Sequence, residues 1–389
     1  MKGLARPLVL VALAAALVDP APAAAAERFV PADAAFVVAN VKQAVPDSGL
    51  RELIERWRAD PRDAASVALA SAFIGHARSL REPMYMGRAE AVLAAAVARP
   101  GASAAARRLY AETLQYRHDF EAAETLLDRL LTADPRDGAA RLQRASIRLV
   151  RGEFAGARTD CALLVATGGA AQAAALACLA ESLAGAGQLP QARALLAAVP
   201  RSDGVDAASM AYLLTVRAEL HERAQAAELA LADYRAALAL NPGDDSTRAS
   251  LADALLARGA ASEARTVLAV SKPGLALLVR AVACAPASER AGLAEQASAW
   301  LELEKSRGDA PHLREAAMLA LTRGDVTTAL AAAEANFRLQ RELPDVRVLA
   351  RAAAAAHDEG ARARLAQWLR QGGFRDAVTE NILAGAARS

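Results

Sequence analysis

Aromatic residues are scarce in this chain, since Phe, Trp and Tyr together make up 4% of its 389 residues. The formal net charge is only +2, and both signs of charge are interspersed along the sequence. Proteins that bind nucleic acid usually carry a basic patch, and those that bind single strands also offer aromatic rings for base stacking. The composition therefore predicts no nucleic-acid partner.

Catalytic and metal-binding motifs are also missing. The histidines stand singly, at positions 76, 118, 221, 312 and 357. His221-Glu222 lacks the second histidine that a zinc protease helix requires. No glycine-rich phosphate loop follows an expected strand, and no G-x-S-x-G motif occurs. We therefore expect no enzymatic activity and no cofactor, although an active site built from scattered residues would leave no motif.

Only three cysteines occur, and an odd number does not suit a disulfide scaffold. Cys161 and Cys178 lie at similar distances on either side of the expected turn at Gly168-Gly169. They would therefore stand at nearly the same height on two antiparallel helices. A bridge needs Cα atoms within about 7 Å, which is closer than most helix pairs come. The sequence leaves two outcomes open, a bridge or buried free thiols.

Long hydrophobic runs are absent, and the longest apolar stretch covers residues 8–18. Lys2 and Arg6 precede it, and the small-residue tract 23–26 follows. A run of this length is too short to span a bilayer, which needs about 20 residues. The pattern is typical of a secretory signal peptide over residues 1–26, with no stable membrane insertion after cleavage. It favours the bacterial periplasm, with secretion from the cell as the alternative.

A short motif recurs along the rest of the chain. Arg151-Gly152-Glu153-Phe154 has counterparts with turn residues His118, Gly187, Gly259 and Gly324, and degenerate copies near Gln225 and Ala291. The period is about 34 residues, and a fixed period of this length indicates a solenoid of helix pairs. We expect pairs at approximately 63–99, 102–133, 138–167, 170–199, 206–240, 246–270, 275–306, 311–342 and 345–371, with a last helix near 374–386.

Two positions are alanine in six of the seven copies, the degenerate copy near Ala291 being the exception. Seven residues before the turn residue stand Ala111, Ala145, Ala180, Ala218, Ala252 and Ala317. Five residues after it stand Ala123, Ala157, Ala192, Ala230, Ala264 and Ala329. Antiparallel helices can cross closely only where side chains are small. The alanines are therefore expected at the crossing points of the helix pairs.

This pattern resembles the tetratricopeptide repeat (TPR) family, whose units combine a small residue in the first helix, a Gly-acid-aromatic turn and a closing proline. Asp60-Pro61, Asp134-Pro135 and Asn241-Pro242 provide such closing signals. Arg107, Arg141 and Arg248 stand where the family usually has tryptophan. The resemblance implies an all-α fold, a right-handed superhelical solenoid of antiparallel helix pairs. We expect a capping segment and helix over 27–60 and the repeat domain, with a C-terminal capping helix, over 61–389.

An acidic residue recurs six positions before the turn residue, in four of six copies: Glu112, Glu181, Glu219 and Asp253. One step from the packed alanine, these side chains should face the concave side of the solenoid and form a discontinuous ladder. Tyr116 is a further groove candidate, because the corresponding region lines the inner surface in the TPR family. A ladder would favour a cationic partner segment. The alternative is an ordinary solvated helix face.

The resemblance implies binding of a protein or peptide segment, as a scaffold or adaptor of the cell envelope. A second interpretation is a helper factor in envelope biogenesis or assembly. The third is an enzyme with an unrecognised site, which a deep pocket of clustered ionisable groups would support.

Overall fold

The structure, a computed structural model, describes residues 48–80, 82–168, 172–197, 199, 206–270, 273–307 and 312–385. The predicted signal peptide and residues 27–47 of the predicted cap lie outside these ranges. The described part contains twenty helices and no strand. Within it, no helix is both long and apolar enough to cross a bilayer.

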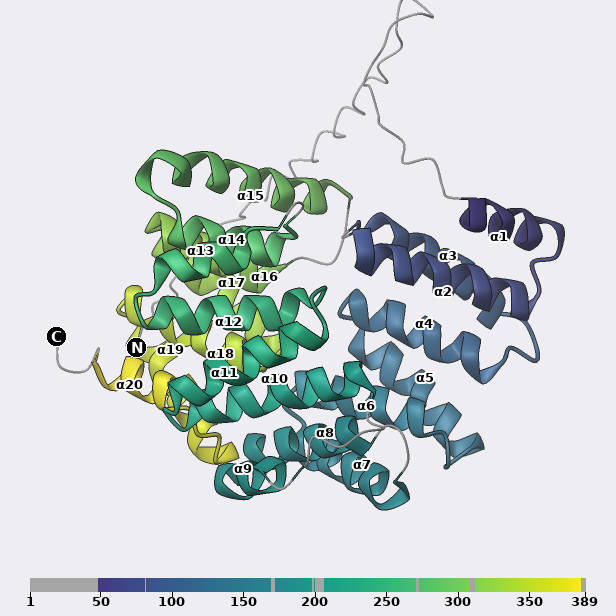
Figure 1. The fold of residues 1–389 in the computed structure, drawn as a ribbon, viewed down its shortest axis with the longest axis horizontal. Coiled ribbons are helices and arrows are strands. Elements are labelled where there is room, and N and C mark those ends of the chain that lie inside the picture. The colour runs from purple at the N-terminus through teal and green to yellow at the C-terminus, as the bar shows by residue number, and fades with distance from the viewer. Residues whose placement is uncertain are drawn as a thin grey trace, which may run out of the picture. The chain divides into compact units, whose positions relative to one another are not determined.

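The helices follow in order: α1 (Ser48–Ala59), α2 (Asp63–Leu80), α3 (Met84–Val97), α4 (Ala104–Tyr116), α5 (Phe120–Ala133), α6 (Gly138–Val150), α7 (Phe154–Thr167), α8 (Gln172–Gly185), α9 (Leu189–Ala197), α10 (Ala207–Arg223), α11 (Ala227–Leu240), α12 (Asp245–Ala257), α13 (Ala261–Leu268), α14 (Leu275–Cys284), α15 (Ala287–Arg307), α16 (Leu313–Arg323), α17 (Val326–Leu339), α18 (Leu343–Ala355), α19 (Glu359–Gly372) and α20 (Ala377–Gly385). Figure 1 shows successive pairs stacked on one another in chain order. The prediction of an all-α helical-repeat solenoid is confirmed.

The turn between the two helices of a pair places one residue in the left-handed backbone region. These residues are His118, Gly152, Gly187, Gln225, Gly259, Gly324 and His357, with φ between 52° and 82°. A non-glycine residue seldom adopts this conformation. The turn register predicted for these copies is therefore correct even where His118 or Gln225 replaces glycine, and a further turn of the same kind lies at His357.

One of the degenerate copies was misplaced. The sequence places a turn near Ala291, but this residue lies inside α15. The preceding helix, α14, ends at Cys284, and α15 begins just after Pro286. Proline suits the first turn of a helix because its missing N–H would have no partner there. It therefore moves the start of α15 forward and removes the left-handed turn.

The alanines at the two fixed positions are all completely buried, at 0% exposure. Ala157 of α7 illustrates their role, since it packs against Ala145 and Leu149 of α6 in one cluster. Side chains of this size let paired helices approach closely, and each pair buries its apolar face against its neighbours.

Replacing Ala157 with Phe should overpack this crossing and lower the free energy of unfolding by about 1–3 kcal/mol. The matched control is Ala155→Phe, at an exposed position of the same helix. It should change stability by no more than about 0.5 kcal/mol. Urea unfolding followed by circular dichroism measures both, and equal losses would contradict a packed crossing.

Two of the arginines that replace the family's tryptophan, Arg141 and Arg248, have a defined structural role. Arg141 donates to the carbonyl oxygen of Pro135 at 2.6 Å, and Arg248 donates to that of Pro242 at 2.5 Å. Each also reaches the second helix of its pair, where Arg141 contacts Asp160 and Arg248 contacts the Val267 carbonyl. The side chain thus ties the closing proline loop to the helix pair that follows it.

The C-terminal helices pack against the middle of the chain. The backbone N–H of Arg341, after α17, donates to the Val150 carbonyl at the end of α6, at 2.7 Å. Arg223 of α10 donates to the Arg375 carbonyl, also at 2.7 Å. A Cβ on Gly187 would lie 2.7 Å from the carbonyl oxygen of Gly373, so two turns touch through their backbones. In Figure 1, α18 and α20 accordingly lie near α10.

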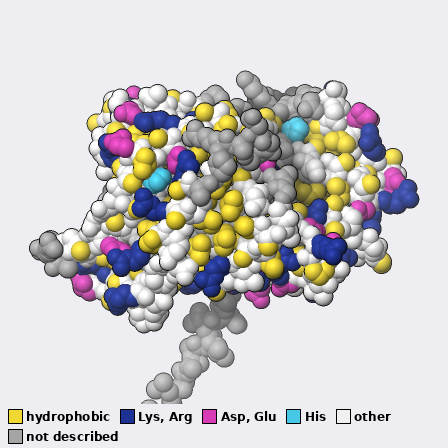
Figure 2. Space-filling model, turned by 60° about the horizontal axis from the view of Figure 1, so that its bottom comes forward, with side chains coloured by type: hydrophobic (Ala, Val, Ile, Leu, Met, Phe, Trp, Pro, Cys, Tyr) yellow, Lys and Arg dark blue, Asp and Glu magenta, His cyan; other side chains and the backbone are white. Residues whose placement is uncertain are grey.

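The surface drawn in Figure 2 carries both signs of charge, dispersed between hydrophobic side chains. Neither Lys and Arg nor Asp and Glu gather in one broad area of that face. This matches the interspersed charge of the sequence.

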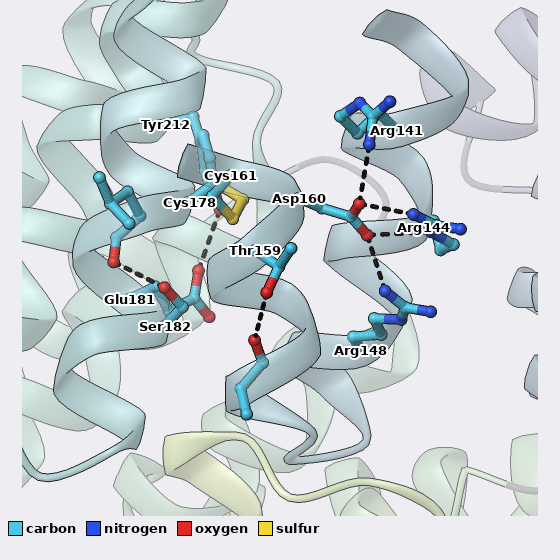
Figure 3. Close-up of a disulfide and its surroundings, with 12 residues drawn as sticks. Arg141, Arg144, Arg148, Thr159, Asp160, Cys161, Cys178, Glu181, Ser182 and Tyr212 are labelled. Carbon is cyan, nitrogen blue, oxygen red and sulfur yellow. Dashed lines mark hydrogen bonds and ion pairs between the residues drawn. A yellow bond between two sulfur atoms is a disulfide. The ribbon is translucent and has the colours of Figure 1, made fainter. Parts of the chain in front are cut away.

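Cys161 of α7 and Cys178 of α8 form a disulfide, with their Cα atoms 5.6 Å apart (Figure 3). Both cysteines are buried, in a cluster that includes the alanines at positions 145 and 157. This Cα separation lies within the range of about 7 Å that a bridge needs, which decides between the two outcomes left open by the sequence. Cys284 is buried and free.

Thiol counting on the unfolded, non-reduced protein should therefore give one free thiol per chain, and three after reduction. The Cys284→Ser variant should give none before reduction, which assigns the free thiol. Three thiols in the non-reduced protein would show that the bridge does not form.

Candidate functional site

A cavity of about 250 Å³ lies between the first helices of three middle pairs and the C-terminal helices. We call it the acidic cavity. Its polar lining includes Glu181, Tyr212, Thr215, Glu219, Arg223, Ser246, Thr247, Arg314, Arg341 and Glu342. Helices α8, α10 and α12 provide one wall, and α16 with the start of α18 provides the other.

Glu181 is held in place by a tyrosine from the next pair. The Tyr212 hydroxyl of α10 donates to Glu181 Oε2 of α8 at 3.0 Å (Figure 3). Burial raises the pKa of Glu181 to about 7, with a further contribution from the negative charge of Glu342. The Tyr212 hydrogen bond opposes the shift, because it stabilises the ionised carboxylate. Glu181 thus titrates near neutral pH.

Glu219 is the second carboxylate of the cavity. Among the described residues, it forms neither a hydrogen bond nor an ion pair with any partner. Burial raises its pKa well above the ordinary value, and the charges of Glu181 and Glu342 raise it further. Arg347 acts in the opposite direction and does not compensate. This half-buried carboxylate is therefore open to a cation or a hydrogen-bond donor that enters the cavity.

Glu342 completes the acidic lining from the C-terminal side. It accepts from Arg314 Nη2 at 2.6 Å, while Arg314 Nε donates to Asp345 Oδ1 at 2.6 Å. Arg314 is therefore already engaged by two carboxylates. It neutralises one wall of the cavity. On the other wall, Glu181 and Glu219 form no ion pair with any residue that the structure describes, although the charge of Arg223 lies near both.

We expect Glu181→Gln to stabilise the protein at pH 8 and to have little effect near pH 4.5. Burial raises the pKa of Glu181 from 4.5 to about 7 in the folded protein. Below pH 4.5 the residue is protonated in both the folded and the unfolded protein, and it does not reduce stability. As the pH rises through 7, the buried side chain must ionise and the folded protein loses stability. Because the residue keeps partial solvent contact, the gain of the variant at pH 8 should be about 1–2 kcal/mol. Urea unfolding at several pH values measures it, with exposed Glu121→Gln as control. A gain that does not depend on pH would contradict the shift.

Asp253 of α12 lies beside the acidic cavity, in a smaller one of about 40 Å³ that Glu219 also lines. Its carboxylate accepts two hydrogen bonds from Arg280 of α14, at 3.0 and 2.7 Å. This bidentate pair satisfies the carboxylate. Asp253 therefore keeps the predicted position but its charge is already compensated.

Glu112 and Tyr116 of α4 lie elsewhere, in a third cavity of about 550 Å³. Glu112 pairs with Arg78 of α2 at 2.5 Å, and Tyr116 is 42% exposed. The structure thus brings Glu181 and Glu219 together, places Asp253 next to them and separates Glu112 and Tyr116. Their role in partner binding stays a prediction.

Several residues of the acidic cavity could not be found from the repeat pattern. Arg314, Arg341 and Glu342 come from the C-terminal pairs, far from α8 and α10 in sequence. A pattern with a period of about 34 residues describes neighbouring pairs only. It carries no signal for contacts between distant ones.

Metal binding finds no support in the described ranges, where no group of three or more His, Cys, Asp or Glu side chains could hold an ion. The expected absence of a cofactor stays a prediction.

The chain is similar to solved structures in its fold, but no family model and no curated protein matches its sequence. A chain of the APC/C hetero-tetramer Cut9–Hcn1 is similar with a TM-score of 0.46 and 15% identity. The match covers 78% of this chain but only 59% of that one.

Two further solved structures are similar. A tetratricopeptide repeat protein from Parabacteroides merdae has a TM-score of 0.39 and 13% identity, over 78% of this chain and 98% of that one. A monomeric mutant of IFIT1 with Gppp-AAAA has a TM-score of 0.46 and 13% identity, over 82% of this chain and 79% of that one. The fold of this chain follows from its own helix pairs. They have left-handed turns in register and alanines at the crossings, as in a TPR-type helical repeat.

Proposed function

We propose that this chain is a non-catalytic binding protein that captures an extended segment of another protein through a cationic side chain. The observation that carries the proposal is the unpartnered carboxylate of Glu219 beside Glu181 in the acidic cavity. An arginine or lysine side chain entering there would satisfy both carboxylates. Its charge would also offset the burial cost that raises their pKa values.

The size of the cavity supports a side chain rather than a whole ligand. Its volume of about 250 Å³ lies below the range of about 300–1,000 Å³ that is usual for small-molecule sites. Specificity would come from the hydroxyls of Tyr212, Thr215 and Thr247, which lie on the same lining. Of these, Thr215 and Thr247 already share a 2.7 Å hydrogen bond.

The test measures binding of extended peptides that carry one arginine, by fluorescence anisotropy. Peptides with citrulline in place of arginine keep the shape and remove the charge. The Glu181→Gln/Glu219→Gln variant should bind the arginine peptides at least about tenfold more weakly, and its affinity should depend less on salt. Adding Glu112→Gln and Asp253→Asn tests the full ladder, and should add little because both are already paired.

The matched control is Glu121→Gln/Glu295→Gln, which removes the same net charge from exposed helix faces. It should leave affinity within about twofold of the parent, because screened surface charges contribute little. Equal affinity for arginine and citrulline peptides, or unchanged binding by the cavity variant at low salt, would refute the proposal.

We also propose that the chain works in the bacterial cell envelope, in the periplasm. The signal-peptide pattern of residues 1–26 supports this location, and so does the disulfide, since such bonds persist in oxidising compartments. Expression of the full chain in a double-membrane bacterium should release a product that begins at Glu27. A product retained in the cytoplasm with an intact N-terminus would contradict it.

A second candidate function, an enzyme, is favoured by one observation. Glu181, with its pKa near 7, shares a cavity with Glu219, and such a pair could act as acid and base. A screen against glycoside and ester substrates tests it, with Glu181→Gln as the control that should be inactive. Turnover that this variant retains would exclude the pair as its source.

A further inference from the structure

A cavity lined by several aromatic side chains lies apart from the acidic cavity. Its volume is about 550 Å³, within the range usual for small-molecule sites. We call it the aromatic cavity, and its lining includes Met86, Tyr116, Phe120, Trp300, Glu304 and His312. These residues come from α3, α4 and α5 on one side and from α15 and the start of α16 on the other.

Glu304 is a buried carboxylate with one oxygen unused. The residue is 5% exposed, and the Trp300 indole N–H donates to its Oε1 at 2.9 Å. His312 Nδ1 lies 2.8 Å from the same oxygen. Its Oε2 is buried and has no hydrogen-bond partner in the described structure. A buried acceptor without a donor is costly, so this oxygen calls for an N–H group from a ligand.

The surroundings favour a cation with an apolar portion. Trp300, Tyr116 and Phe120 contribute aromatic rings, which attract cations through their faces. Met86 adds an adaptable apolar side chain.

Within the described lining, the cationic side chains do not donate a hydrogen bond to Glu304 Oε2. Arg78 is already paired with Glu112 at 2.5 Å. Burial lowers the pKa of His118, and the positive charge of His312 lowers it further, so His118 is neutral near pH 7. His312 reaches Oε1 of Glu304, on the other oxygen.

We propose that the aromatic cavity binds an organic cation that carries N–H donors, an alkylammonium or an alkylguanidinium, with one N–H bonded to Glu304 Oε2. The alkyl part would lie among Met86, Tyr116 and Phe120. The cation could be a free small molecule or the side chain of a bound peptide, since the chemistry is the same. The site is distinct from the acidic cavity and does not depend on the function proposed for it.

Isothermal titration of the full mature chain with agmatine, at low ionic strength and pH 8, tests the site. We expect saturable binding with a stoichiometry of one, and at least about tenfold weaker binding by Glu304→Gln. Tetramethylammonium has the charge but no N–H, and it should also bind at least about tenfold more weakly than agmatine. The matched control is Glu302→Gln, at an exposed position of the same helix. It should leave the affinity within about twofold of the parent.

A second measurement does not depend on a variant at Glu304 folding correctly. The indole N–H signal of Trp300, assigned with Trp300→Phe, should shift on agmatine addition because it is bonded to the same carboxylate. An acetylated, amidated arginine then distinguishes the sources: stronger binding than agmatine supports a peptide side chain, and weaker binding supports a free cation.

No saturable agmatine binding, equal binding by Glu304→Gln, or equal binding of tetramethylammonium would overturn the proposal. A Trp300 signal that does not move while agmatine binds would also overturn it, because the cation would then be elsewhere.

Discussion

Replacing Arg347 with Met should lower the free energy of unfolding by about 3–5 kcal/mol. Arg347 of α18 donates to both oxygens of Asp376, at 2.9 and 3.1 Å, and to Glu222 of α10 at 3.2 Å. Asp376 is 0% exposed, so the variant leaves a buried carboxylate without its cation. The variant would also weaken the contact between the C-terminal helices and the middle pairs, because Arg347 bonds to Glu222 of α10.

Arg351 provides the matched control, one turn further along α18. It is largely enclosed and burial lowers its pKa, but in the described part of the chain it forms no ion pair. Arg351→Met should therefore change stability by less than about 1 kcal/mol. The Arg347→Met/Asp376→Asn variant should regain part of the loss, because the buried charge is gone. Urea unfolding measures all three, and equal effects of the two arginine variants would show that the ion pair is not the cause.

Asp160→Asn should be the second strongly destabilising change, with a loss of about 3 kcal/mol. Asp160 of α7 is 1% exposed and accepts from Arg141, Arg144 and Arg148 of α6, at 2.6–3.2 Å (Figure 3). The neutral side chain would leave three guanidinium groups close together with less compensating charge. Asp160 also adjoins Cys161, so the network lies beside the disulfide.

Asp128→Asn is the matched control, since Asp128 accepts from the same Arg144 at 2.6 Å but its side chain is 50% exposed. Screening by water should limit its effect to about 0–1 kcal/mol. Unfolding is measured with the disulfide intact and after reduction. If Asp160→Asn cost no more than Asp128→Asn in both states, burial would not decide the strength of these ion pairs.

The helix pairs and their turns could be predicted from the sequence because they depend on local chemistry. A left-handed turn residue, an acidic N-cap and a buried alanine act within one pair or between neighbours. Asp119 and Asp325 show this, as each caps the helix after its turn through a side-chain hydrogen bond. The turn near Ala291 was misplaced because Pro286 imposes a different local start on α15.

The cavities were decided by the tertiary structure alone. Glu181 and Glu219 stand at equivalent repeat positions, so their placement on neighbouring first helices follows from the period. Their environment does not, because Glu342 and Arg314 arrive from pairs more than 90 residues away. Contacts such as Arg347 with Glu222 depend on the rotation accumulated over many pairs and on individual loops. A repeat sequence determines each step between neighbours, whereas small differences in those steps determine which distant surfaces meet.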